Sequence, residues 1–257
     1  MGVLFLVFCG GALLLRGAFI LRLAALFKPD AVMGMVSRQQ VEIGRKLFWL
    51  ASTFGGMKVG FERFRGSPLP RTFMIISNHQ SLADIAALAA AFPSHGIRFV
   101  AKRELGRWVP YVSLNLRLGR HAVISRTSDF RHGHRVLTKL ADLACQGYCP
   151  VVFAEGRRSR TGDVQPFQGG AARIILERAP MPVVSVALNG GYRISRLGAL
   201  LSNMGSTFYR LKPLTLYPAP RSKAEIVDLL SRTHDEISRQ VLSWQEEERS
   251  GIKKPIR

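Results

Sequence analysis

A histidine and an aspartate follow a predicted strand at 72–77 and could serve acid–base chemistry. His79 and Asp84 are five residues apart in the segment N-H-Q-S-L-A-D. On one continuous helix their side chains would point about 140° apart and could not pair. We therefore expect His79 on the turn after the strand and Asp84 in the first turns of the following helix, where sites in α/β folds form.

Such a pair can activate an alcohol. The carboxylate fixes the tautomer of the imidazole and leaves its other nitrogen basic. The ring can then take the proton of a substrate hydroxyl as the oxygen attacks an acyl carbonyl, without a serine or cysteine nucleophile. Ser81 lacks a G-x-S-x-G elbow, so we interpret it as a helix cap or a polar loop residue. The alternative is that His79 caps the helix and Asp84 only favours its dipole.

A second polar loop, A-E-G-R-R-S-R-T-G at 154–162, follows a predicted strand at 150–153. Gly156 lets the backbone approach a ligand closely, and arginines offer bidentate forks for phosphate. The segment 166–170 leads into a helix whose free N–H groups could add to an anion site. The pattern favours an anion-binding loop, and a basic surface loop is the alternative.

Together these motifs resemble the glycerolipid acyltransferase family, especially the 1-acylglycerol-3-phosphate acyltransferases. The family's first block, N-H-x4-D, matches Asn78, His79 and Asp84. Its third block, F-P-E-G-T-R-S, is matched except at two positions, where this chain has Ala154 and Arg157. The second and fourth blocks resemble V-I-S-R at 123–126 and P-V-V-S-V at 182–186, where Ser125 replaces an acid and Ser185 a proline.

The resemblance implies a role for each matched residue. His79 is the general base and Asp84 its orienting partner, and Arg158 holds the acceptor's phosphate. The implied substrate-binding residues are Glu155, Gly156, Arg158, Ser159, Lys102 and Arg126. The acyl donor is acyl-CoA or acyl carrier protein, and no metal or other cofactor is implied. The expected reaction acylates the free hydroxyl of lysophosphatidate to give phosphatidate; another lysophospholipid or a lyso-aminolipid is the alternative acceptor.

The elements that must position these residues alternate between strand and helix beyond residue 58. Strands are expected at 72–77, 97–101, 121–125, 150–153 and 182–188, and helices at 82–91, 105–117, 130–146 and 170–179. This order predicts an α/β fold with a mixed, mainly parallel sheet flanked by helices. Ser222 and Glu225 form a capping-box signature that opens a helix to about Glu248.

The N-terminal segment 3–27 is apolar except for Arg16 and Arg22. A helix of this length, about 37 Å, could cross a hydrocarbon core of roughly 30 Å. Two arginines are costly at mid-bilayer, so a shallow insertion with both arginines at the headgroups competes with a true span. A buried soluble helix is a third alternative. A second helix at 31–54 would complete a hairpin that rests on a membrane.

Three regions follow: a membrane-associating helical hairpin at 1–57, an α/β acyltransferase domain at 58–220, and a C-terminal amphipathic helix with a basic tail at 221–257. The net charge of +20 suits acidic partners. We expect the chain to bind an anionic membrane surface, at the cytoplasmic face of the cell membrane, as well as the acidic donor and acceptor. We expect no nucleic acid, because no motif accompanies the dispersed basic residues. A non-enzymatic basic membrane-binding module is the remaining alternative.

Other reactive or aromatic residues have unremarkable interpretations. The cysteines have no zinc spacing, and we expect each to be a buried, inert thiol; they are Cys9, Cys145 and Cys149. Three histidines are interpreted as part of a solvated or lipid-facing basic face rather than as metal ligands; they are His121, His132 and His134. The tryptophans are either interfacial anchors or ordinary packing; they are Trp49, Trp108 and Trp244.

Overall fold

A mixed β-sheet forms the centre of the computed structural model, which describes residues 2–106, 109–124 and 130–251. Over these ranges the sheet has seven strands in the order β1-β7-β6-β2-β5-β3-β4. The strands are β1 (Lys58–Phe61), β2 (Met74–Ser77), β3 (Gly96–Lys102), β4 (Ala122–Ile124), β5 (Tyr148–Phe153), β6 (Val183–Asn189) and β7 (Phe208–Tyr217). The pairs among β6, β2, β5, β3 and β4 are parallel, whereas β7 runs antiparallel to β6 and parallel to β1. The predicted fold class is confirmed.

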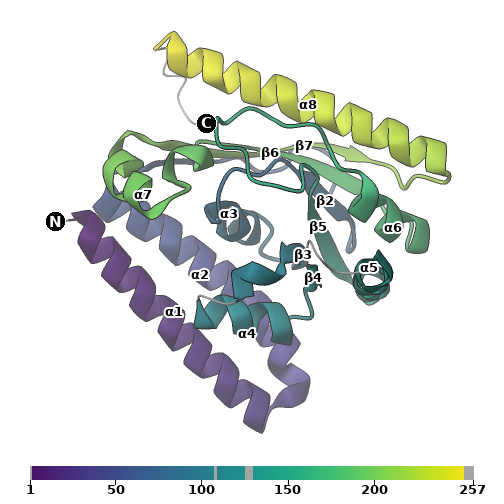
Figure 1. Ribbon diagram of the computed structural model, residues 1–257, viewed down its shortest axis with the longest axis horizontal. Helices are drawn as coiled ribbons and strands as arrows, with labels where there is room; N and C mark the ends of the chain where they lie inside the picture. The colour runs from purple at the N-terminus through teal and green to yellow at the C-terminus, as the bar shows by residue number, and fades with distance from the viewer. Residues whose placement is uncertain (1, 107–108, 125–129, 252–257) are drawn as a thin grey trace.

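Helices cover both faces of this sheet (Figure 1). They are α1 (Gly2–Phe27), α2 (Val32–Gly55), α3 (Ala83–Ala91), α4 (Pro110–Leu118), α5 (Phe130–Cys145), α6 (Gly170–Arg178), α7 (Leu197–Asn203) and α8 (Lys223–Arg249). On one face of the sheet, α3, the N-terminal end of α1 and the C-terminal end of α2 share a hydrophobic core with the strands. On the other face, α5, α6 and α8 pack against the strands. The central strands β2 and β6 are buried along their whole length, as the near-continuous apolar runs of covered parallel strands require.

The N-terminal helices form a hairpin that packs against the rest of the fold. A short 3₁₀ turn at Pro29–Ala31 joins α1 to α2. α2 lies so close to α3 that a Cβ on Gly44 would come within 2.5 Å of the carbonyl oxygen of Ala86. Glycine is therefore required at position 44, and the hairpin touches the backbone of α3 directly.

One face of α1 is buried and the other is exposed. Ala18 and Leu21 pack against α2 and α4. Large apolar side chains stand exposed on the other face, at Leu4, Phe5, Phe8, Leu15, Phe19, Leu26 and Phe27. Among the described residues α1 alone is long and apolar enough to cross a membrane, and 28% of its most apolar window is buried. Such limited burial argues against a buried soluble helix.

The C-terminal helix α8 is capped and anchored to the sheet by polar bonds. The Ser222 hydroxyl accepts the N–H of Glu225 at 3.1 Å, so the predicted cap is present. Within α8, the Glu236 carboxylate accepts hydroxyls from Ser185, Thr215 and Tyr217 on the neighbouring strands. Ser185, where the family block has a proline, therefore donates a hydrogen bond that proline could not make, and helps to bind α8 to β6.

Most predicted elements are found within two residues of their expected bounds, but one predicted helix was wrong and three elements were not predicted. The helix expected at 105–117 is a 3₁₀ turn at Arg103–Gly106 and a separate α4 that begins at Pro110, because proline favours the first turn of a helix. The strands β1 and β7 and the helix α7 were not predicted. β1 is a four-residue edge strand, and β7 contains charged residues and Pro213, which weaken an apolar strand pattern.

Cysteines and tryptophans depart in part from expectation. Cys149 is buried as predicted, and burial raises the pKa of its thiol to about 11. Cys145, the last residue of α5, is exposed, so the prediction of a buried thiol was wrong there. Trp244 belongs to α8 and is buried between this helix and the sheet, whereas Trp49 is 60% exposed on α2. Trp108 lies outside the described residues.

Candidate active site

The predicted His–Asp pair lies at the carboxyl end of β2. His79 occupies the turn after the strand and Asp84 the first turn of α3, with His79 Nδ1 2.8 Å from Asp84 Oδ2. With the Nδ1 proton directed at the carboxylate, Nε2 remains as the basic nitrogen. The alternative of a helix cap was wrong: the N-cap of α3 is Leu82, and no side chain caps it.

Asp84 is fully buried and held by further donors. Its Oδ2 also accepts the backbone N–H groups of Gln80 at 2.6 Å and Ser81 at 2.9 Å. Its Oδ1 accepts the hydroxyls of Ser81 at 3.2 Å and Tyr209 at 2.6 Å. Burial, and then the charge of Asp84, raise the pKa of Tyr209 well above its usual value, so this phenol remains a donor. The carboxylate is thus fixed in the orientation that faces His79.

Asn78 connects the histidine turn to the next strand. Its amide nitrogen donates to the carbonyl of Leu188 at 2.9 Å, and its amide oxygen accepts the N–H of Leu188 at the same distance. The side chain therefore extends the pairing of β2 with β6 beyond the last backbone pair. This places the turn that carries His79 firmly against the sheet and explains the asparagine before the histidine.

The imidazole of His79 stacks on an aromatic column. Its ring lies 4.0 Å from that of Phe153 with an interplanar angle of 14°. Phe99 stacks behind Phe153 at 6.1 Å, and His121 behind Phe99 at 5.7 Å. Phe153 is the last residue of β5 and lies opposite Ser77 of β2. The register of two neighbouring strands thus supports one face of the imidazole.

His121 is not on a solvated basic face, and that interpretation was wrong. It is 7% exposed, and its Nδ1 accepts the backbone N–H of Phe99 at 2.9 Å. Burial lowers the pKa of His121 to about 3, so the ring is neutral near pH 7. His132 and His134 are exposed on α5. No group of three or more potential metal ligands occurs among the described residues.

The second predicted loop lies against the first. Glu155 Oε1 accepts the backbone N–H of His79 at 2.9 Å, and the N–H of Ser159 donates to the carbonyl of His79 at 2.7 Å. Gly156 has φ +66°, a left-handed conformation that favours glycine. The carboxyl ends of the adjacent strands β2 and β5 therefore bring both motifs together.

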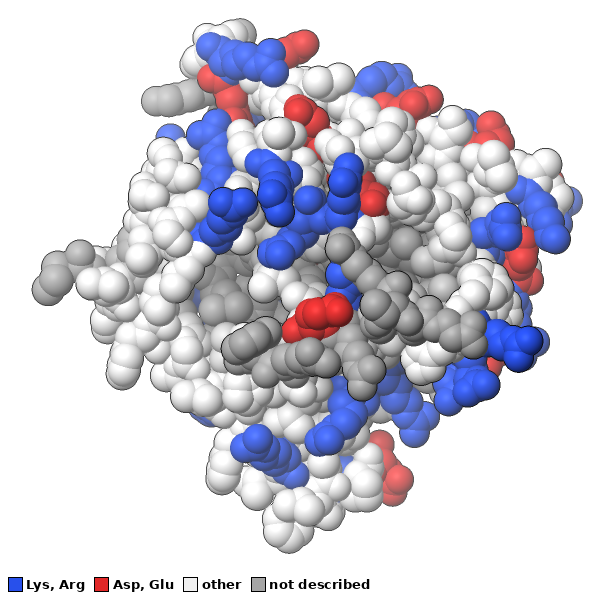
Figure 2. All heavy atoms as spheres, in the orientation of Figure 1, with Lys and Arg blue, Asp and Glu red and all other residues white. Residues whose placement is uncertain are grey.

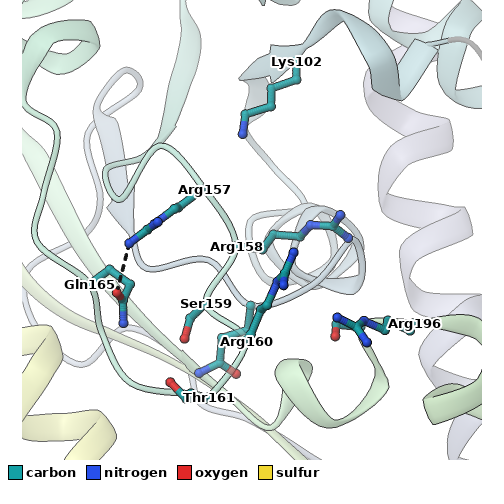
Figure 3. Close-up of a pocket in the computed structure, with 10 residues that line it drawn as sticks. Lys102, Arg157, Arg158, Ser159, Arg160, Thr161, Gln165 and Arg196 are labelled. Atoms are coloured by element: carbon teal, nitrogen blue, oxygen red, sulfur yellow. Dashed lines mark hydrogen bonds between the residues drawn. The ribbon is translucent and has the colours of Figure 1, made fainter. Parts of the chain in front are cut away.

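A cavity of about 620 Å³ opens beside these loops (Figure 3). It is lined by Gln80, Lys102, Arg157, Arg158, Ser159, Arg160, Thr161, Gln165, Ser195 and Arg196. Five of these described residues are cationic and none is acidic. Figure 2 shows Lys and Arg atoms gathered on this face of the molecule. The arrangement places the paired His79 and Asp84 on the turn next to a strongly positive cavity, which suits an anionic substrate.

The predicted substrate-binding residues take different places. Lys102, Arg158 and Ser159 line the cavity. Glu155 and Gly156 instead line a smaller neighbouring pocket with Pro166. Arg126 lies outside the described residues. Glu155 is also bound to the histidine turn, a contact that the resemblance alone did not indicate.

Several residues of the site escaped the sequence analysis. Arg157 and Arg160 belong to the recognised loop and were signalled only by its basic composition. Arg196, the residue before α7, and Tyr209 on β7 come from distant segments, and nothing in the local pattern places them here. Gly191, after β6, was also missed: a Cβ there would lie 2.9 Å from Asp84 Oδ1.

Comparison with known proteins shows what the central part of the chain is similar to. Residues 63–189 match the family model described as Acyltransferase. The chain is 28% identical over 174 residues to the 1-acyl-sn-glycerol-3-phosphate acyltransferase alpha of Ovis aries, covering 66% of this chain and 58% of that protein. It is 31% identical over 163 residues to the 1-acyl-sn-glycerol-3-phosphate acyltransferase of Helicobacter pylori, covering 63% and 60%. The matches thus span less than two thirds of these relatives.

The fold is shared more completely with a solved structure. The crystal structure of the 1-acyl-sn-glycerophosphate acyltransferase of Thermotoga maritima superposes with a TM-score of 0.71. The match covers 95% of each chain at 23% sequence identity. The whole architecture described above, including the N-terminal hairpin, therefore follows that of a known fold. The predicted resemblance is confirmed.

Burial of Glu155 predicts a pH-dependent stability. Burial raises the pKa of this carboxyl from 4.5 to about 7, so the folded state keeps a proton that the unfolded state releases between these values. The free energy of unfolding should fall as pH rises through this window, by up to roughly 3 kcal/mol. Urea unfolding of Glu155→Gln, which can still accept the His79 N–H, should lack this decline. The exposed control Glu246→Gln should retain it, and a parallel decline in both variants would contradict the prediction.

Proposed function

We propose, from the acyltransferase-family domain that residues 63–189 form, that the chain transfers a fatty acyl group to the free hydroxyl of lysophosphatidate, giving phosphatidate. The observation that carries the proposal is the contact of 2.8 Å between His79 Nδ1 and Asp84 Oδ2, on the turn next to a cationic cavity. The donor is the thioester of coenzyme A or of acyl carrier protein. No further cofactor is needed for this reaction.

The chemistry follows from the free nitrogen of His79. Nε2 takes the proton of the acceptor hydroxyl while the oxygen of this hydroxyl attacks the thioester carbonyl carbon. The tetrahedral intermediate then collapses with cleavage of the carbon–sulfur bond, and the imidazolium returns its proton to the leaving thiolate. Asp84 stabilises the imidazolium and keeps the ring in place, and Phe153 restricts its tilt.

The acceptor's phosphate would bind in the cavity. Lys102 and Arg158 enter it from β3 and from the loop after β5, and Figure 3 shows their side chains on its wall. Arginine can bind phosphate through two parallel hydrogen bonds. A cavity whose described lining is cationic and free of carboxylates suits a phosphate better than the ammonium group of a lyso-aminolipid. A lyso-aminolipid is therefore the second candidate for the acceptor.

The exposed face of α1 supports docking on an anionic membrane, at the cytoplasmic face of the cell membrane. Its large apolar side chains would enter the acyl region, while Arg16 and Arg22, both exposed, would reach the phosphate headgroups. A fatty acceptor and product remain in a bilayer, so an enzyme for them gains from a shallow position on its surface.

Membrane docking through α1 predicts an effect of a single charge. Phe19 is 61% exposed on this face. Phe19→Asp should weaken co-sedimentation with vesicles of phosphatidylglycerol and phosphatidylethanolamine by about tenfold or more, because the lost burial of one aromatic side chain is of this size. Val227→Asp on α8 is the matched control. Equal binding by the two variants would show that α1 does not carry the docking face.

Loss of the general base predicts loss of turnover. With purified chain, lysophosphatidate and palmitoyl-CoA or palmitoyl carrier protein, His79→Ala should lower kcat by about a thousandfold. Vesicle binding should persist in this variant. The exposed His132→Ala on α5 should retain its rate. Full turnover by His79→Ala would end the catalytic assignment.

Loss of the phosphate contact predicts weaker binding without slower chemistry. Arg158→Gln should raise the KM for lysophosphatidate by about tenfold to a hundredfold, the size of a charge-assisted hydrogen bond, with kcat largely kept. Monoacylglycerol, which lacks the phosphate, should be used equally by this variant and the parent chain. Arg173→Gln on α6 serves as the control. An unchanged KM for lysophosphatidate would place the phosphate elsewhere.

A further inference from the structure

The cavity beside the histidine turn holds more positive charge than one acceptor phosphate needs. Five of its described lining residues are cationic and none is acidic. A phosphate monoester carries about two negative charges near pH 7. Lys102 and Arg158 therefore match the charge of lysophosphatidate, and three arginines remain on the same wall.

Two of these three arginines are not paired with a carboxylate in the part of the chain that the structure describes. Within the described ranges, neither Arg160 nor Arg196 forms an ion pair, whereas nearby Arg193 is paired with Glu248 at 3.2 Å and Arg210 with Glu247 at 2.7 Å. Arg157 differs, because its guanidinium donates to Gln165 and turns aside (Figure 3). Unpaired like charges around one cavity raise its positive potential.

Arg160 and Arg196 come from different segments that the fold holds together. Arg160 belongs to the loop after β5, and Arg196 is the residue before α7. Gln80 links the segments: its amide nitrogen donates to the carbonyl of Gly162 at 3.0 Å, and its amide oxygen accepts the N–H of Tyr192 at 3.4 Å. Gln80 is buried next to His79, so the same residue ties the arginine-bearing segments to the histidine turn.

We infer that Arg160 and Arg196 form a second phosphate subsite, distinct from that of Lys102 and Arg158. The inference rests on the proposed function for its occupant, which is either a phosphate of a coenzyme A thioester or a second phosphate on the acceptor headgroup. The volume of about 620 Å³ is within the usual range of small-molecule sites. In Figure 3, Lys102 lies at one end of the cavity and Arg160 and Arg196 lie toward the other.

Binding measurements test the subsite without any turnover. Free coenzyme A and inorganic pyrophosphate are titrated calorimetrically into the full chain in detergent micelles, with inorganic phosphate for comparison. Arg160→Gln and Arg196→Gln should each weaken the binding of coenzyme A or pyrophosphate by about tenfold or more. Their effect on the binding of inorganic phosphate should be smaller. Arg232→Gln on α8, which removes one charge far along the chain, is the control. Binding equal to that of this control in both variants would overturn the subsite, even if acyl transfer itself were absent.

Kinetics then distinguish the two sources of the phosphate. If the donor supplies it, the variants raise the KM for palmitoyl-CoA but not for palmitoyl-pantetheine, which lacks the pyrophosphate. If the acceptor supplies it, they raise the KM only for a lysolipid whose headgroup carries two phosphates. A rise confined to lysophosphatidate would mean that all four cations share one phosphate, and the second subsite would be refuted. Absence of transfer by the parent chain would refute the proposed function and leave the binding result to decide the subsite.

Discussion

The hydrogen bond between His79 and Asp84 constrains the whole centre of the molecule. Two residues five apart cannot pair on one continuous helix. In this structure they pair because a turn after β2 carries His79 and the first turn of α3 carries Asp84. The buried carboxylate then needs further donors, which come from the turn itself and from Tyr209 on β7. A strand more than a hundred residues away is thereby part of the same site.

Local patterns predicted much of this site, because its two motifs are each continuous in sequence. The turn with His79 and the loop with Glu155 and Arg158 follow apolar runs that become neighbouring strands. What the sequence could not reveal depends on long-range packing. The hydroxyl of Tyr209, the guanidinium of Arg196 and the burial of His121 follow from strand order and register, which no single segment encodes. β7 was missed for a related reason: its pairing with β6 compensates for a weak strand pattern.

The loop after β5 combines two opposite electrostatic situations within a few residues. Glu155 turns inward, where burial raises its carboxyl pKa to about 7 while it supports the histidine turn. The arginines that follow turn outward and create a positive surface. The positive φ of Gly156 allows the chain to reverse direction between the two. A departure from the family block, Arg157 for threonine, adds to the outward charge without disturbing the inward contact.

The close approach of α2 to α3 at Gly44 has a practical consequence for protein engineering. Trimming the hairpin to obtain a detergent-free sample would uncover α3 and remove Leu6 and Phe48 from the main core. Aggregation rather than a well-behaved truncated form would result. Solubilising substitutions restricted to the outward face of α1 would leave those internal contacts intact and offer a better route to crystals without lipid.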